Sequence, residues 1–228
     1  MHGMFNSATS FNGEISKWDV SKVINMNHMF WQAKFFKRRI CGASWVNSKA
    51  SQIDMFTGSP GGVCTIALAS RTSLKHAIVA CLKLSPNGDC FDSQSGSISE
   101  WEVSAVTNMD NIFDGETLFN GDISKWDVSA VTTMSAMFAG ATSFNGDLSK
   151  WDVSSVIDMG AMFRRAPAFN GDLSAWDMPR AVDMSATFAH ATSFNGEISN
   201  WNVSSVNTMT SMFESATSFK HTSHSVNT

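Results

Sequence analysis

Apolar side chains recur along this chain at a fixed interval of 25 residues. One phenylalanine, one tryptophan and one methionine position keep this interval through the second half of the sequence. These positions are Phe119, Phe144, Phe169, Phe194 and Phe219; Trp101, Trp126, Trp151, Trp176 and Trp201; and Met109, Met134, Met159, Met184 and Met209. A sustained period of roughly 20 to 50 residues is typical of arrays in which each unit buries its apolar face against its neighbours. The pattern therefore predicts a repeat solenoid.

The first half of each copy predicts a short strand. In the copy that begins at Phe119, the residues Ile123, Trp126 and Val128 form an apolar-x-x-apolar-x-apolar run, whose last pair alternates with a period of two. An Asn-Gly pair precedes such a run and supplies the positive φ that a tight turn needs. These pairs begin at Asn12, Asn120, Asn145, Asn170 and Asn195.

The second half of each copy predicts a short helix. Val131, Met134, Phe138 and Ala141 stand at offsets of 0, 3, 7 and 10, so they fall on one helical face, and Ser129 is available as the N-cap. One coil is then strand, turn, helix and turn. The expected fold class is an α/β repeat solenoid like that of leucine-rich repeats, with short parallel strands and short helices, interrupted by one capping helix.

The recurring aromatic residues are expected to form the structural core. Tryptophans of successive coils should stack on the strand side and phenylalanines on the helical side of one continuous core. The predicted core residues are Trp101, Trp126, Trp151, Trp176, Trp201, Phe138, Phe163, Phe188 and Phe213. The methionines recur at core-facing offsets too, which indicates packing rather than a copper or cofactor site.

The repeated string F-N-G-D-I-S-x-W-D-V-S-x-V-x-x-M-x-x-M-F resembles the BspA-like leucine-rich-repeat surface proteins. Within these proteins it resembles specifically the 25-residue version first described as a mycoplasma domain of unknown function and abundant in marine algae and other protists. The resemblance covers residues 1–58 imperfectly and residues 98–219 closely. It implies display at the cell surface or outside the cell, adhesion and protein contacts, and it provides no catalytic residues to carry over.

The repeat pattern divides the chain into four segments. In the second copy Trp45 comes two residues late, register is lost by Phe56, and the segment Gly58-Ser59-Pro60-Gly61-Gly62 then interrupts the repeats. The offsets of Leu74, Ile78, Cys81 and Leu82 predict an amphipathic helix outside the period. The expected segments are a truncated and degenerate repeat block, 1–58; a linker, 59–97, with a capping helix, 72–84; a five-copy solenoid, 98–219; and a tail, 220–228.

The start of the chain lies inside a repeat. Met4-Phe5 stands six residues before Phe11, as Met137-Phe138 does before Phe144. Two explanations stay open: either residues upstream of Met1 are missing from this sequence, or the first coil is naturally truncated. The compartment therefore cannot be read from the N-terminus.

The four cysteines, Cys41, Cys64, Cys81 and Cys90, contain no C-x-x-C spacing and have no histidine at ligand spacing, which disfavours a zinc site. Cys81 and Cys90 flank the end of the expected capping helix. A disulfide between them would staple that turn in an oxidising compartment, and the alternative is two thiols.

Carboxylates recur in two columns. Stacked carboxylates repel one another unless hydroxyls, backbone N–H groups or cations offset the charge. For the column after tryptophan, turn capping by the following serine-rich segment is the interpretation; for the other, calcium is the candidate cation. The columns are Asp127, Asp152 and Asp177, and Asp122, Asp147, Asp172 and Glu197. A glycosidase pair is disfavoured, because a position repeated in every coil lacks the differentiated acid and base that catalysis requires.

Composition disfavours several classes of partner. The chain has 228 residues, is 43% hydrophobic and 16% charged, and carries a net charge of −4. Its densest basic cluster, Lys34, Lys37, Arg38 and Arg39, lies in one degenerate repeat, forms no stripe and is interpreted as a solvated loop rather than a nucleic-acid site. No apolar run approaches the ~20 residues of a transmembrane helix. We expect no enzyme activity, no catalytic residue and no cofactor.

Two functions remain. The first is a non-catalytic protein–protein interaction or adhesion module that presents a solenoid surface. The second is a structural accessory subunit of a larger assembly of an alga or protist, such as a membrane or photosynthetic complex. The partner in either case is another protein or protein complex, through which peripheral membrane association would arise. The localisation stays open between the cell surface or exterior and an organelle-associated complex.

Overall fold

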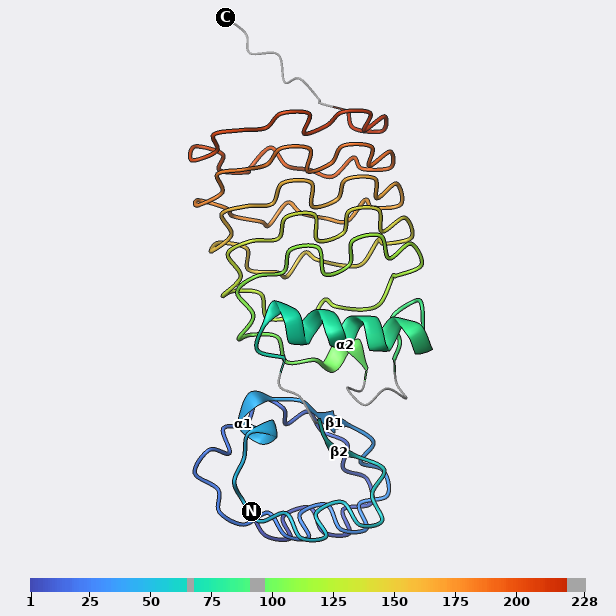
Figure 1. The fold of residues 1–228 in the computed structure, drawn as a ribbon, viewed down its shortest axis with the longest axis vertical. Coiled ribbons are helices and arrows are strands. Elements are labelled where there is room, and N and C mark those ends of the chain that lie inside the picture. Colours follow the sequence, from blue (N-terminus) through green and yellow to red (C-terminus); the bar gives the residue numbers. More distant parts are fainter. Residues whose placement is uncertain (65–67, 91–96, 221–228) are drawn as a thin grey trace, which may run out of the picture.

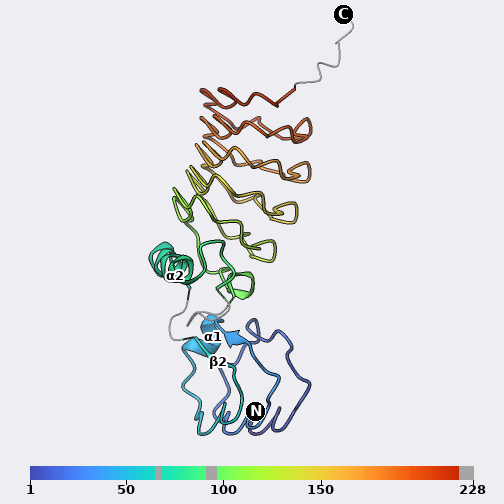
Figure 2. The ribbon, with the colours of Figure 1, turned by 90° about the vertical axis from the view of Figure 1, so that its right-hand side faces the viewer.

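The structure is a computed structural model that describes residues 1–64, 68–90 and 97–220. The expected tail, 220–228, lies outside these ranges except for Lys220. Coils are stacked in two groups, which we call the first stack, residues 1–64, and the second stack, residues 98–219 (Figure 1). A view from the side shows the same order, with helix α2 lying across the start of the second stack (Figure 2).

Among the described residues, helices and strands of more than one residue occur only up to residue 100. In chain order these are β1 (Arg39–Ile40), α1 (Ala43–Val46), β2 (Gly62–Val63), α2 (Arg71–Leu84) and the 3₁₀ turn η1 (Ile98–Glu100). Strands β1 and β2 are parallel, with Arg39 opposite Gly62 and Ile40 opposite Val63. Within the described ranges, no helix is long and apolar enough to cross a membrane.

Successive coils of the second stack are joined by backbone hydrogen bonds. The N–H groups of Met134, Ala136, Phe138 and Gly140 each donate to a carbonyl of the following coil at 2.8 Å. Single parallel bridges place equivalent residues of neighbouring coils side by side. The bridged residues are Asn108, Thr133, Asp158, Asp183 and Thr208.

The expected helix over Val131–Ala141 is not formed. N–H groups between those that donate to the next coil close four-residue β-turns, as Met137 N does on Met134 O at 3.1 Å. Ala136 has a φ of 51°, which an α-helix does not contain. Because alternate N–H groups bond to the next coil, the i to i−4 bonds of a helix cannot form.

The expected strand over Ile123–Val128 is not formed either. Trp126 N–H donates to Ile123 O at 3.1 Å, so this segment contains a turn. Its apolar side chains are nevertheless buried, as the pattern requires. The second stack thus winds with the 25-residue period through turns and bridges, and its classification as a leucine-rich-repeat solenoid stays a prediction.

Two phenylalanine ladders fill the core of the second stack. Phe138 lies 5.4 Å from Phe113 and 5.5 Å from Phe163, and Phe144 of the other ladder lies 4.0 Å from Phe138, measured between ring centroids. All nine predicted core aromatics are buried except Phe213, which is half-buried because no described coil follows it.

The tryptophans add hydrogen bonds to this core. Four indole N–H groups of the second stack donate to a carbonyl of the preceding coil, as Trp151 Nε1 does to Ile123 O at 3.2 Å. Equivalent bonds of 2.9 to 3.0 Å are made by Trp126, Trp176 and Trp201. The indole therefore both packs and ties two coils together, a role that spacing alone did not indicate.

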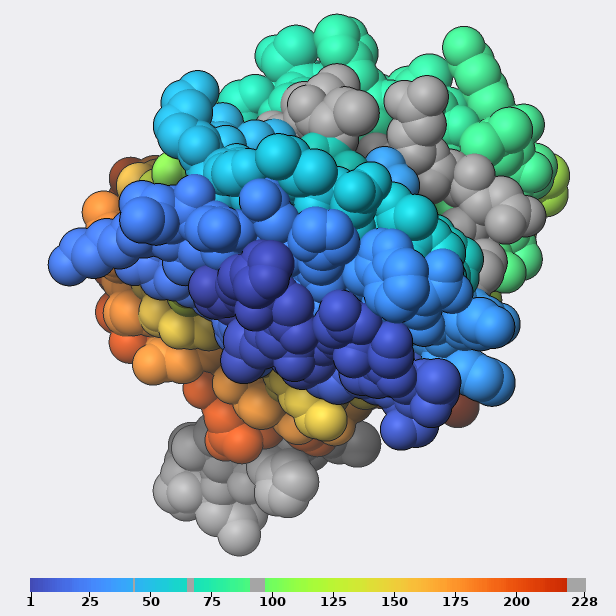
Figure 3. Space-filling view, turned by 90° about the horizontal axis from the view of Figure 1, so that it is seen from below, coloured from blue at the N-terminus to red at the C-terminus, as the bar shows by residue number. Residues whose placement is uncertain are grey.

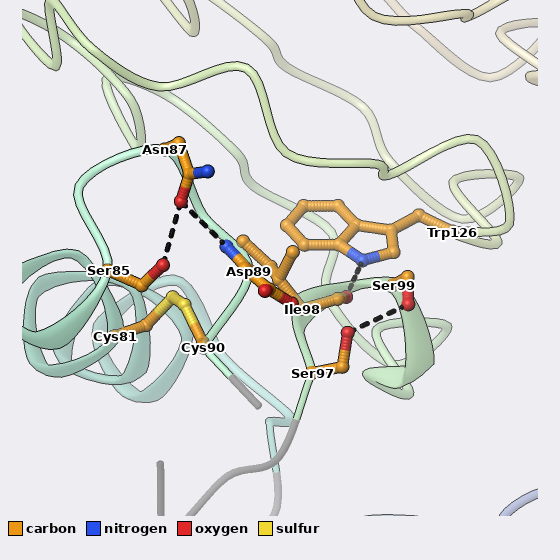
Figure 4. The surroundings of a disulfide bond; sticks show 9 residues. All are labelled: Cys81, Ser85, Asn87, Asp89, Cys90, Ser97, Ile98, Ser99 and Trp126. Carbon is orange, nitrogen blue, oxygen red and sulfur yellow. Dashed lines mark hydrogen bonds between the residues drawn. A yellow bond between two sulfur atoms is a disulfide. The ribbon is translucent and has the colours of Figure 1, made fainter. Parts of the chain in front are cut away.

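Helix α2 covers the first coil of the second stack. It begins one residue before the expected helix, with Ser70 as N-cap in reciprocal contact with Ser73. Its apolar stripe joins the core of the second stack. Cys81 is bonded to Cys90, which fastens the end of α2 to the next segment (Figure 4).

The first stack has a separate core. Trp45 is buried there, and its indole N–H donates to Ile15 O at 2.9 Å, so the tryptophan that comes late in the repeat keeps the bond of the other copies. A second disulfide joins Cys41 to Cys64 across β1 and β2. This pairing was not expected from the sequence.

Candidate interaction surfaces

The bridged positions form a polar face along the second stack, which we call the ladder face. It comprises the bridged residues and those two positions further on in each coil. Its members are Asn108, Asp110, Thr133, Ser135, Asp158, Gly160, Asp183, Ser185, Thr208 and Thr210. Backbone bonds hold successive coils in the same register, so equivalent positions recur regularly along this face.

Side chains of the ladder face bond to one another between coils. Asp110 Oδ1 accepts from Thr133 Oγ1 at 2.5 Å and from Ser135 N at 2.8 Å, while Asn108 Nδ2 donates to Asp110 Oδ2 at 3.0 Å. Ser135 Oγ donates to Gly160 O at 3.2 Å. These bonds fix the side chains, so a partner would meet a rigid surface.

Two carboxylates lie next to each other on this face. Burial raises the pKa of Asp158, and the charges of Asp183 and Asp110 raise it further, against the lowering effect of the bond that its carboxylate accepts from Gly160 N at 2.8 Å. Asp183 Oδ1 accepts from Ser185 N at 2.7 Å. The ionised form of Asp158 is therefore held at some cost to the fold.

The carboxylates of the proposed calcium column accept hydrogen bonds within their own turns. Asp147 Oδ1 accepts from Ser149 N at 2.9 Å and from Ser149 Oγ at 2.7 Å, and these bonds lower its pKa. Asp122, Asp172 and Glu197 receive the same backbone bond from the serine two residues on. Among the described residues, no group of three or more His, Cys, Asp or Glu side chains could hold a metal ion.

The column after tryptophan caps turns as well. Asp127 Oδ1 accepts from Ser129 Oγ at 2.7 Å, and Asp152 Oδ1 accepts from Ser154 N at 3.0 Å. The serine bonds lower the pKa of both carboxyls. Both carboxylates thus have a local structural role, as the capping interpretation expects.

The junction between the stacks is polar. Arg38 pairs with Glu14 at 3.2 Å and with Glu100, and Lys125 Nζ lies 3.3 Å from Glu100. Burial raises the pKa of Glu100, and a hydrogen bond with Glu14 raises it further, while Arg38 and Lys125 lower it. The expectation of a solvated basic loop is therefore wrong for Arg38, because its charge is paired across the junction.

A hollow of about 270 Å³ lies beside these ion pairs. Its lining residues come from both stacks and the linker. They are Asn12, Lys37, Arg38, Arg39, Ser97, Ser99 and Glu100. Within this lining, Arg38 and Glu100 pair with each other, and Lys37 and Arg39 leave the lining with more basic than acidic groups.

The comparisons with known proteins give one match. A family model described as Mycoplasma protein of unknown function, DUF285, matches residues 1–61, 87–185 and 147–228. No curated protein and no solved structure matches the chain.

Proposed function

We propose that this chain, which belongs to the family described as Mycoplasma protein of unknown function, DUF285, is a non-catalytic module that binds another protein. The observation that carries the proposal is the ladder face. Five coils present the same two positions in parallel register, and hydrogen bonds between coils fix the side chains there. Repeat proteins use such extended regular surfaces to bind macromolecules.

The state of the carboxylates supports a non-catalytic role. Asp147 and Asp152 each accept hydrogen bonds from the serine two residues on, which lowers their pKa and keeps them ionised at neutral pH. A general acid needs a raised pKa and a partner of different pKa facing the same substrate. Identical turns repeated in each coil do not provide one carboxyl with a raised pKa beside another with a lowered pKa.

We further propose that the module acts as a BspA-like leucine-rich-repeat surface protein, in adhesion or recognition outside the cytosol. The family match supports only the less specific part of this proposal, which is membership of a related repeat family. The disulfides Cys41–Cys64 and Cys81–Cys90 support an oxidising compartment, where such bonds persist.

A second candidate is a structural accessory subunit of a larger assembly. The last coil favours it, because Met209 is 40% exposed and Phe213 is only half-buried, although their equivalents in earlier coils are buried. A subunit that continues the stack would cover these side chains.

The test is capture of partners from the native source by chemical cross-linking, with quantitative mass spectrometry. Ser135→Arg places a long cation on the ladder face, and Ala130→Arg places the same group on an exposed turn outside it. We expect the first variant to lose a specific partner at least tenfold and the second to retain it. Equal capture by both variants would exclude the ladder face, and a turnover lost in Asp147→Asn would indicate an enzyme.

A further inference from the structure

One segment of each coil, equivalent to residues 134–140, bonds to the following coil in one sense. Elsewhere in the coil the bonds run the other way, as Thr132 N donates to Thr107 O of the preceding coil at 2.8 Å. In the second stack, N–H groups of that segment donate to carbonyls of the following coil, and Phe188 N donates to Met212 O at 2.9 Å in this way. In the first stack, Phe5 N donates to Met29 O at 2.8 Å. Along this segment, each stack therefore has an end that presents carbonyls, its leading edge, and an end that presents N–H groups, its trailing edge.

The last coil of the second stack presents a trailing edge. Ser211, Phe213 and Ser215 occupy the positions whose N–H groups donate to the next coil in earlier repeats, and these N–H groups have no acceptor among the described residues. The Phe213 ring stacks on that of Phe219, with centroids 4.1 Å apart. Both rings are only half-buried.

The first coil of the first stack presents a leading edge. His2, Met4 and Asn6 stand where carbonyls accept from a preceding coil in later repeats, and within the described part of the chain their carbonyls have no donor. The ring of Phe5 stacks on that of Phe11 at 3.9 Å, and both are half-buried. Seen from below, these first residues lie at the outer surface of the first stack (Figure 3).

The other leading edge of the molecule shows what such an end requires. Helix α2 supplies donors to the first coil of the second stack: Arg71 Nε donates to Asp110 O at 2.7 Å, and Lys75 Nζ donates to Ile112 O at 2.9 Å. Those carbonyls are the ones that a preceding coil would bond. Side chains of α2 thus replace a coil there, and the described residues contain no such replacement at His2, Met4 and Asn6.

We propose that a second copy of this chain docks head to tail, with its leading edge on the trailing edge of the first copy. Continuing the repeat register pairs Ser211 N with His2 O, Phe213 N with Met4 O and Ser215 N with Asn6 O, each residue pair spanning the two copies. Phe213 and Phe219 then stack on Phe5 and Phe11, which have the same spacing of six residues.

This match of donors, acceptors and rings favours a second copy over an unrelated partner, which would have to reproduce all three by other means. The contact is not symmetric, so it leaves one free edge of each kind on every dimer and leads to open-ended growth.

One bond of the internal repeat is absent: Lys220 stands where an asparagine accepts from the next coil, as Asn145 Oδ1 does from Asn170 N. Association should therefore be weaker than coil stacking within the chain. The inference rests on the proposed function, since it names the partner of such a module.

Sedimentation velocity of the 228-residue chain over a wide concentration range tests the proposal. We expect the mean sedimentation coefficient to rise with concentration. Met4→Arg and Met209→Arg each place a charge on one edge, at side chains that are 53% and 40% exposed, so the fold should tolerate them. Each variant alone should stay monomeric, and circular dichroism should show an unchanged fold.

Mixing the two variants gives the sharper result. Met209→Arg keeps its leading edge and Met4→Arg keeps its trailing edge, so an equimolar mixture should form dimers and grow no further. Leu118→Arg, which changes a side chain that is 62% exposed and on neither edge, should associate like the wild type. A monomeric wild type at every concentration, or association that survives Met4→Arg, would overturn the proposal.

The two proposals fail in different ways. A monomeric chain that still loses its partner in the Ser135→Arg variant would refute head-to-tail docking and leave the ladder-face function standing. Concentration-dependent growth through the edges, together with equal partner capture by Ser135→Arg and Ala130→Arg, would support the docking and refute the ladder face as the site of the proposed function.

Discussion

Replacing Trp151 with alanine should lower the free energy of unfolding by about 4 kcal/mol. The side chain is only 4% exposed, and a buried indole removes about 200 Å² from water, which at ~25 cal/mol per Å² stabilises the fold by about 5 kcal/mol. Alanine keeps a small part of that area. The indole also donates to Ile123 O at 3.2 Å, and its ring lies 6.4 Å from that of Phe138.

Trp151→Phe separates the two contributions. Phenylalanine keeps most of the apolar contact but has no donor for Ile123 O. That carbonyl still accepts from Trp126 N at 3.1 Å, so the loss should be about 1 kcal/mol, the net value of one hydrogen bond, plus a smaller packing term.

Urea unfolding followed by far-ultraviolet circular dichroism measures both variants. Trp18→Ala is the matched control, because Trp18 holds the same repeat position in the first stack but is 37% exposed, and it should cost less than half as much as Trp151→Ala. A loss below about 1 kcal/mol for Trp151→Ala would show that the tryptophan column does not hold adjacent coils together.

Three further predictions concern the cap and the ladder face. Replacing Cys81 and Cys90 with serine should lower stability by about 2 to 3 kcal/mol in urea unfolding, because the bond closes a loop in the unfolded chain. Under reducing conditions, which also open Cys41–Cys64 in both proteins, the wild type and the variant should have equal stability. Lys75→Met should lower stability by about 1 to 2 kcal/mol in the same assay, because it keeps the apolar stem but removes the donor to two carbonyls. Lys83→Met, in the last turn of α2, is the control and should leave stability nearly unchanged. Equal losses in the two variants would refute the capping role of Lys75. The pKa of Asp158 is higher in the folded than in the unfolded chain, so the wild type loses stability as the pH rises above the unfolded pKa of about 4. Asp158→Asn should therefore be more stable than wild type at pH ~7 and should lose that advantage below pH ~4. A difference in stability that stays the same from pH ~7 to below pH ~4 would contradict the raised pKa.

The 25-residue period carried most of what could be predicted. It identifies which residues become neighbours in adjacent coils, and the tryptophan and phenylalanine columns are buried for that reason. Helix α2 was predictable to within one residue, because Leu74, Ile78, Cys81 and Leu82 follow a helical period behind a serine-rich cap.

The path of the backbone within a coil was not predictable from the same pattern. Val131, Met134, Phe138 and Ala141 fit one helical face, but successive β-turns bring side chains back to the same side at nearly the same spacing. Apolar spacing records which side chains point inward. It does not record whether an N–H group bonds within its own coil or to the next one.

Two contacts across the fold required the coil geometry as well as the sequence. Cys41 and Cys64 are separated by 23 residues, close to one repeat, so stacking places them together, and this spacing was the available signal. The pairing of Arg38 with Glu14 and Glu100 had no comparable signal, because Glu100 belongs to the other stack and meets Arg38 only through the junction.

The two ends of a coil stack leave different backbone groups without a partner coil, and helix α2 supplies partners at one such end. A leading edge presents carbonyls, which the long cationic side chains Arg71 and Lys75 can satisfy from a helix laid across the coil. Along the segment equivalent to residues 134–140, a trailing edge presents N–H groups, and lysine and arginine cannot satisfy these because their side chains have no acceptor. A cover for Ser211, Phe213 and Ser215 must therefore bring carbonyl or carboxylate oxygens at the spacing of the repeat. The first coil of another copy offers such oxygens in register, together with rings that continue both phenylalanine ladders, whereas a helix like α2 does not.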